Sequence, residues 1–309
     1  MLFSTVKMYT FCLLDNTFLK GYGVKRMDSR TELDSEQREL HTEAIRGAVQ
    51  EREYVDGVLL ERVRITENSA AKALQRPVGT YITVKFGDLA VISDHSAIRN
   101  AVIRALCVLL PDIRDNVLVV GLGNSDITPD AIGPMTADRM LATRHIGGAL
   151  SHEHGLTGLK SVSAIIPGVL GKTGIEAVDI IKGTVERTHP QAVILIDALA
   201  ARRTERLCRT VQLCDTGIAP GSGVNNSRLE ISPKVLGVPV IAVGVPTVVD
   251  VASLICDYTG HTPERALGQM MVTPKEIDLL IRRSAELLAE ALNMFLQPEL
   301  DEKTLRALV

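Results

Sequence analysis

One stretch, residues 117–134, constrains the fold of this 309-residue chain more than any other. It opens with an uninterrupted apolar run, Val117-Leu118-Val119-Val120, which is typical of a strand buried on both faces. Two glycines end the strand, and Thr128-Pro129-Asp130 then supplies an N-cap residue, a proline for the first helical position and an acid. A helix over 135–142 is expected to follow. The pattern places Asp130 beyond the carboxyl end of a central strand, where open α/β sheets hold their sites.

A second stretch has the same design. The apolar run over 192–196 predicts another buried strand, and Asp197 follows it directly. If both strands lie in one parallel sheet, both carboxylates project at the same edge, and two acids in one cleft suit general acid–base chemistry. The alternative is that Asp130 only adds charge to a helix N-terminus and that Asp197 caps the next element.

The rest of the chain predicts an α/β fold with a mostly parallel or mixed central sheet and helices on both faces. Residues 30–50 are charged and predict an extension or a disordered segment. The expected strands are 58–65, 81–86, 161–166, 210–214 and 239–245, and the expected helices are 96–110, 175–187, 246–255 and a long last helix opened by a capping box at 273–276.

Composition excludes several classes of function. Aromatic residues make up 3% of the chain and the formal charge is −3, so we expect no direct contact with nucleic acid. No apolar run approaches the ~20 residues of a membrane span, so no membrane partner is expected. The five cysteines form no C-x-x-C pair, which indicates a reducing cytoplasm and cysteines that serve as small core residues.

Other candidate sites are weaker. Gly121-Leu122-Gly123 lacks the third glycine of a dinucleotide loop and has Asp126 there instead, so no cofactor is expected. The loop over 217–223 predicts an anion nest, a flap or a plain sheet-edge loop. For the two histidines in 152–154, the surrounding sequence favours a position in a solvated loop. For His145, its position after the expected helix favours interaction with the helix C-terminus.

Long ordered motifs resemble the germination protease (spore endopeptidase) family. The resemblance spans roughly residues 117–280 and rests on these runs: 119–124, 128–134, 143–145, 162–164, 167–169, 173–176, 196–202, 215–218, 220–224, 236–242, 244–250 and 271–276. The segment between Asp257 and Met271 is shorter than the family pattern, and the first 26 residues do not resemble a family leader, which makes Met8 and Met27 candidate starts.

The resemblance implies an endopeptidase, made as a self-processing zymogen, that degrades small acid-soluble spore proteins at germination. It also implies a homotetramer in the cytoplasm of the spore core and a fold similar to that of hydrogenase-maturation endopeptidases. The family's essential aspartates fall on Asp130 and Asp197. Further candidates for support of the substrate or the site in this sequence are Asn124, Asp126, His145, Glu176, Arg202, Gly221, Ser222 and Gly223.

Three interpretations of this site stay open at this point. An aspartate pair that shares a proton can activate water without a metal. The same carboxylates, with His145, can instead hold a divalent ion, although this is a weak zinc set. A non-catalytic α/β module that binds anions at its glycine loop is the third.

The N-terminal segment carries a candidate processing site. Thr31-Glu32-Leu33-Asp34-Ser35-Glu36 resembles the type of site that the family cuts in its substrates. We therefore predict self-cleavage between Glu32 and Leu33, with residues 1–32 as a pro-segment. Residues 33–309 are predicted to form one peptidase domain, with an N-terminal strand and helix subregion over about 55–112. The alternative is a charged, solvated arm with a chance match.

Overall fold

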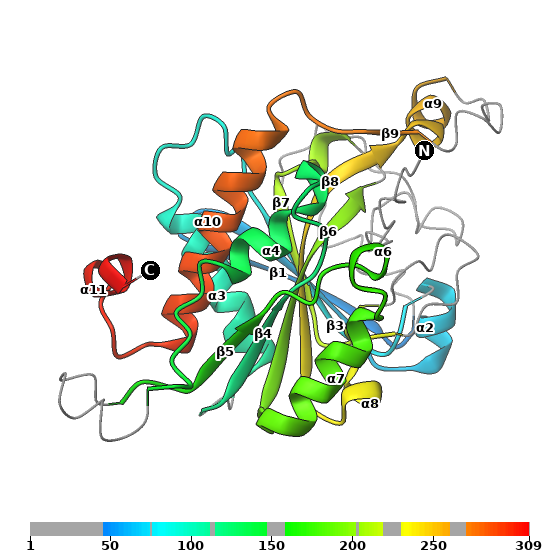
Figure 1. The fold of residues 1–309 in the computed structure, drawn as a ribbon. Coiled ribbons are helices and arrows are strands. Elements are labelled where there is room, and N and C mark those ends of the chain that lie inside the picture. The colour runs from blue at the N-terminus through cyan, green and yellow to red at the C-terminus, as the bar shows by residue number, and fades with distance from the viewer. Residues whose placement is uncertain are drawn as a thin grey trace.

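A single mixed sheet with helices on both faces organises the computed structural model, which describes residues 46–74, 76–111, 115–146, 158–201, 204–218, 230–259 and 270–308 (Figure 1). The strand order is β1-β2-β3-β7-β8-β6-β4-β5, and β9 pairs with β8 outside this path. The strands are β1 (Ala48–Val55), β2 (Val58–Ile65), β3 (Gly79–Lys85), β4 (Val117–Gly121), β5 (Val162–Ile165), β6 (Ala192–Ala201), β7 (Thr210–Cys214), β8 (Val240–Asp250) and β9 (Met271–Val272). The expected α/β fold class is confirmed.

The sheet has a parallel half and an antiparallel half. Strands β8, β6, β4 and β5 run parallel to one another, whereas β1, β2, β3 and β7 form an antiparallel run that joins β8. The central strands open with apolar runs because helices cover both faces, and every residue of β4 is buried. The parallel half therefore holds the carboxyl edge on which the sequence predicts a site.

Two cores lie on opposite faces of the sheet, and alternate strand residues point into each. The first core packs α3 (Ser96–Leu109), α4 (Ile132–Ala137) and α10 (Ile277–Leu296) against residues such as Val119 and Ile194. The second packs α2 (Asn68–Leu74), α7 (Ala177–Thr188) and α8 (Pro233–Leu236) against residues such as Val120 and Leu195. Figure 1 shows the helices of the two sets on either side of the sheet. The other helices among the described residues are η3 (Thr128–Asp130), α6 (Leu170–Thr173), η4 (Thr204–Arg206), α9 (Val251–Thr259) and α11 (Glu302–Leu308).

Several predicted strand and helix boundaries are wrong, mostly because strand pairing decides where an element begins or ends. Strand β1 is charged and mostly exposed, so apolar periodicity does not reveal it, and its pairing with β2 forms it. The helix expected over 246–255 starts only at Val251, because β8 continues to Asp250 through pairing with β6 and β9. The helix expected over 135–142 is the shorter α4.

The predicted capping residues also act differently. Helix α10 begins at Ile277 without a side-chain cap. Thr273 instead donates its hydroxyl to the Thr247 carbonyl at 3.0 Å and so ties β9 to β8. Thr128 lies inside the 3₁₀ turn η3 rather than capping an α-helix.

The cysteines divide by position. Cys208 and Cys214 are buried core residues, as expected, and burial raises the pKa of the Cys208 thiol to about 12. Cys107 is exposed on α3, so the prediction of a core role is wrong there.

The predicted N-terminal subregion continues the main sheet, because β3 pairs with β7. The predicted pro-segment over 1–32 lies outside the described residues, so the domain boundary stays a prediction. Among the helices described, none is both long and apolar enough to cross a membrane.

Candidate active site

Asp197 lies where β6 outruns its neighbour β4. The last residue of β4, Gly121, is paired with Ile196, so Asp197 is the first residue of β6 beyond that pairing. It does not end its strand as predicted, because β6 continues to Ala201 beside β8. The side chain is fully buried, and its Oδ1 accepts the Ala198 N–H at 2.9 Å.

Asp130 reaches the same place from a loop that folds back onto the end of β4. The Asn124 N–H donates to Asp130 Oδ2 at 2.9 Å and to the Asp130 carbonyl at 3.2 Å. Gly123, with a φ of +119°, allows this return, because a Cβ there would lie 2.1 Å from the Asp130 carbonyl. Asp130 is only 4% exposed, so its backbone hydrogen bond offsets part of the cost of its burial.

The loop Leu122-Gly123-Asn124 joins the two acids. The Leu122 N–H donates to the Ile196 carbonyl at 2.8 Å, which holds this loop beside Asp197, and η3 packs against β6 and β8. Both aspartates therefore lie around one glycine loop at the carboxyl edge of the parallel strands. Two buried carboxylates in such a position suit activation of a water molecule.

Close packing of α4 fixes this loop. A Cβ on Gly133 would lie 2.1 Å from the Leu122 carbonyl and 2.5 Å from the Ile196 carbonyl. Gly133 thus lets α4 contact the backbone of both strands at the site. The sequence analysis assigned this glycine no packing role, because its contacts come from residues distant in the chain.

Three of the predicted supporting residues lie at this carboxyl edge. Asn124 is buried, and its side-chain oxygen accepts the Asp126 N–H at 3.1 Å. Asp126 is exposed and forms an ion pair with Lys172 of α6, a residue that the sequence analysis missed. Glu176 precedes α7 in the segment that follows β5, and its side chain forms no cap. Arg202, Gly221, Ser222, Gly223, Glu32 and Leu33 lie outside the described residues.

The structure places His145 at the opposite edge of the sheet from the two aspartates, and its supporting role stays a prediction. The Thr143 and Arg144 N–H groups both donate to the carbonyl of Val162, the first residue of β5. Val162 pairs with Val117, the first residue of β4. The two aspartates instead lie near the other end of β4, beyond its last residue, Gly121. Strand β4 therefore separates this exposed histidine from Asp130 and Asp197 within one chain.

The described residues do not supply a complete set of metal ligands. Within those parts of the chain, no three His, Cys, Asp or Glu side chains come together in a way that could hold an ion. The aspartate pair thus lacks the third and fourth protein ligands of a closed zinc site.

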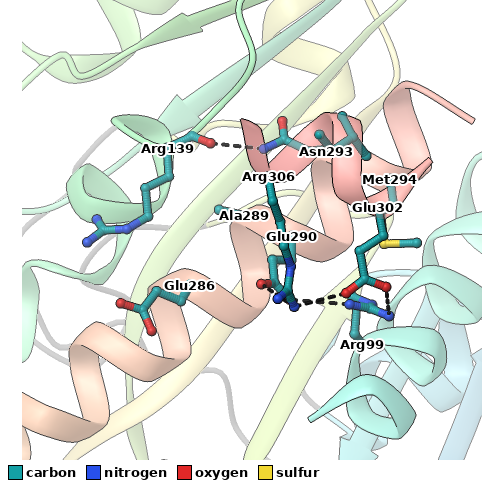
Figure 2. Close-up of a pocket in the computed structure, with 10 residues that line it drawn as sticks. Arg99, Arg139, Glu286, Ala289, Glu290, Asn293, Met294, Glu302 and Arg306 are labelled. Carbon is teal, nitrogen blue, oxygen red and sulfur yellow. Dashed lines mark hydrogen bonds and ion pairs between the residues drawn. The ribbon is translucent and has the colours of Figure 1, made fainter. Parts of the chain in front are cut away.

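A pocket of about 230 Å³ lies elsewhere, among α3, α10 and α11. Figure 2 shows four charged side chains of its lining that face one another, those of Arg99, Glu290, Glu302 and Arg306. Arg99 contacts Glu290 at 3.4 Å and Glu302 at 3.0 Å, and Arg306 contacts the same two carboxylates at 3.3 and 2.9 Å. These groups neutralise one another and fasten α11 to α3 and α10, so we interpret the cluster as structural.

Two aspartates buried at the carboxyl edge of the parallel strands form a site that suits hydrolytic chemistry. The germination protease family model matches residues 24–262. The chain belongs to the germination protease family and is a spore-germination endopeptidase.

Curated relatives match along nearly their whole length. A germination protease from Caldanaerobacter subterraneus subsp. tengcongensis is 40% identical, with 91% of this chain and 98% of the relative covered. One from Clostridium perfringens (strain SM101) is 36% identical, with 88% and 96% covered. Among solved structures, a NiFe hydrogenase maturation protease from Thermococcus kodakarensis matches with 18% identity and a TM-score of 0.36, over 61% of this chain and 98% of that one. Because the chain belongs to a peptidase family, the alternative of a non-catalytic anion-binding module is rejected.

Proposed function

We propose that this protein degrades small acid-soluble spore proteins at germination, with Asp130 and Asp197 as the groups that activate water. The observation that carries the proposal is the burial of both aspartates around the loop Leu122-Gly123-Asn124. Incubation of the purified full chain with such a spore protein tests it directly. Mass spectrometry should detect discrete fragments, and an intact substrate after prolonged incubation would refute the proposal.

The mechanism follows from two carboxyl groups that share one site. Ionising both in a buried site is costly, so one holds the proton while the other is ionised. The ionised carboxylate removes a proton from water as the water oxygen attacks the peptide carbonyl. The protonated partner then donates its proton to the leaving nitrogen, and the C–N bond breaks. The Asn124 N–H holds the Asp130 carboxyl group in place through this cycle.

The metal-free mechanism makes a prediction about chelation. Exhaustive dialysis against a strong chelator is expected to leave kcat/KM within about twofold of the untreated value, because the aspartates lack further protein ligands among the described residues. Peptidase assays before and after dialysis measure this, with a zinc peptidase dialysed in parallel as the control. Activity that disappears and returns with one particular divalent ion would favour the metal-dependent alternative.

A second proposal concerns maturation. We propose that the zymogen cuts itself between Glu32 and Leu33, where an acid precedes the bond and a large apolar residue follows it. The charged surroundings, which lack core periodicity, suit a segment that enters a cleft as an extended strand. Residues 1–32 would then be released.

Intact-mass analysis of incubated protein tests self-cleavage. The expected product begins at Leu33, and Asp130→Asn is expected to stay unprocessed. Processing of Asp130→Asn at the normal rate, or a product that begins elsewhere, would contradict cleavage by the chain's own site at this bond.

The remaining proposals rest on the family. They are assembly as a homotetramer and action in the cytoplasm of the spore core. Light scattering of the purified chain measures the first, and a tetramer mass of about four times 33.5 kDa is expected.

A further inference from the structure

The extension of β6 beyond β4 leaves one of its edges without a neighbouring strand. Strand β6 continues past Asp197 to Ala201, and β8 accompanies it on one side up to Val249. On the other side, β4 ends at Gly121 and its chain turns away through the glycine loop. In the described part of the chain, no strand takes the place of β4 there.

The backbone geometry identifies which groups face this open edge. The Val193 N–H donates to Pro239, on the β8 side, whereas the Ile196 carbonyl accepts from Leu122, on the β4 side. Because backbone groups alternate along a strand, even-numbered residues of β6 face the line of β4. Ala198 and Ala200 therefore present their N–H and C=O groups to the open edge.

Most of these groups have no hydrogen-bond partner among the residues that the structure describes. The Ala198 N–H donates to Asp197 Oδ1. Among the backbone hydrogen bonds that the described residues form outside the strand ladders, none involves the Ala198 carbonyl or either backbone group of Ala200. Unpaired strand groups of this kind are a template for another extended chain.

We propose that the substrate peptide binds to the edge of β6 at Ala198 and Ala200 as an added β-strand, in the line that β4 leaves open. The proposal rests on the proposed endopeptidase function and says how the scissile bond reaches the aspartates. An extended polypeptide is the ligand that offers N–H and C=O groups at the repeat of a strand, about 6.6 to 6.8 Å for every two residues.

The location brings the peptide to the site. Paired strands lie about 4.8 Å apart, so a peptide beside Ala198 would pass next to Asp197 and approach the loop that carries Asp130. Ala200 is partly exposed, whereas Ala198 is 6% exposed. The peptide would thus enter beside Ala200 and reach the aspartates at the buried end. The irregular pairing of β6 with β8 between Leu199 and Ala200 lies in this segment, as bulges near active sites often do.

A series of N-methylated peptides tests the docking. Each peptide carries the sequence of residues 31–36 with native flanks and one N-methyl group, moved stepwise along the backbone and kept off the scissile amide. Since only every second substrate N–H faces β6, kcat/KM is expected to fall about tenfold at alternate positions and less than about threefold at those between. The positions between are matched controls within the same series.

The outcomes separate the docking from the function. If the unmodified peptide is cleaved but methylation shows no alternation with position, strand addition at β6 is refuted while the peptidase activity stands. If the unmodified peptide and whole spore protein both resist cleavage, the proposed function fails and the docking fails with it. No variant of the protein is needed, so misfolding does not complicate the result.

Discussion

Asp130→Asn and Asp197→Asn are each expected to lower kcat/KM for a spore-protein substrate by about 10³-fold or more, as for catalytic groups that act as a unit. Each change replaces the carboxyl group that takes or gives the proton by an amide group of nearly the same shape. An amide oxygen at position 130 can still accept the Asn124 N–H, and one at position 197 can still accept the Ala198 N–H. The loss should therefore reflect chemistry rather than a collapsed loop. The double variant should be little slower than either single one, because removing one partner already disables the pair.

The control is Asp138→Asn, an exposed aspartate that follows α4. It is expected to keep activity within about twofold, as surface changes away from a site usually do. Thermal unfolding of all three variants checks that the fold is intact. A folded Asp130→Asn or Asp197→Asn protein with near-normal activity would remove that residue from the catalytic assignment.

Gly133→Ala is expected to reduce the free energy of unfolding by about 3 kcal/mol, the upper end of the usual range for an overpacked core position. The new methyl group would lie 2.1 Å from the Leu122 carbonyl and 2.5 Å from the Ile196 carbonyl. Both contacts are backbone atoms, one in β6 and one directly after β4, so neither can move aside as a flexible side chain would. Relief of the clash requires α4 to lift from the sheet, which would also shift the loop beside Asp197.

Urea unfolding measures this effect, and Gly183→Ala is the matched control. Gly183 lies in α7 with open space around its Cβ position, so alanine should raise stability by up to about 1 kcal/mol through helix propensity. Equal stability of Gly133→Ala and the parent protein would contradict the close approach of α4 to the two strands.

Local patterns in the sequence were sufficient to predict the central architecture. The apolar runs at 117–120, 192–196 and 239–245 correspond to β4 and to the first parts of β6 and β8, because strands covered on both faces consist mainly of apolar residues. Alternation of such runs with amphipathic helices predicts parallel strands, and parallel strands end at one edge. The common edge of Asp130 and Asp197 was therefore predictable from local order.

The tertiary structure decided how far each element extends and what lies beside it. Strand β8 continues through Pro246 because β6 runs beside it, and β1 forms beside β2 without an apolar pattern of its own. Thr273 bonds to Thr247 rather than capping α10, and His145 lies at the far edge from the aspartates. Each of these outcomes depends on groups from segments well separated along the chain, which local periodicity does not encode. The sequence alone thus determined which strands carry the acids, whereas strand pairing determined that β6 outruns β4 and places Asp197 at the end of an open edge.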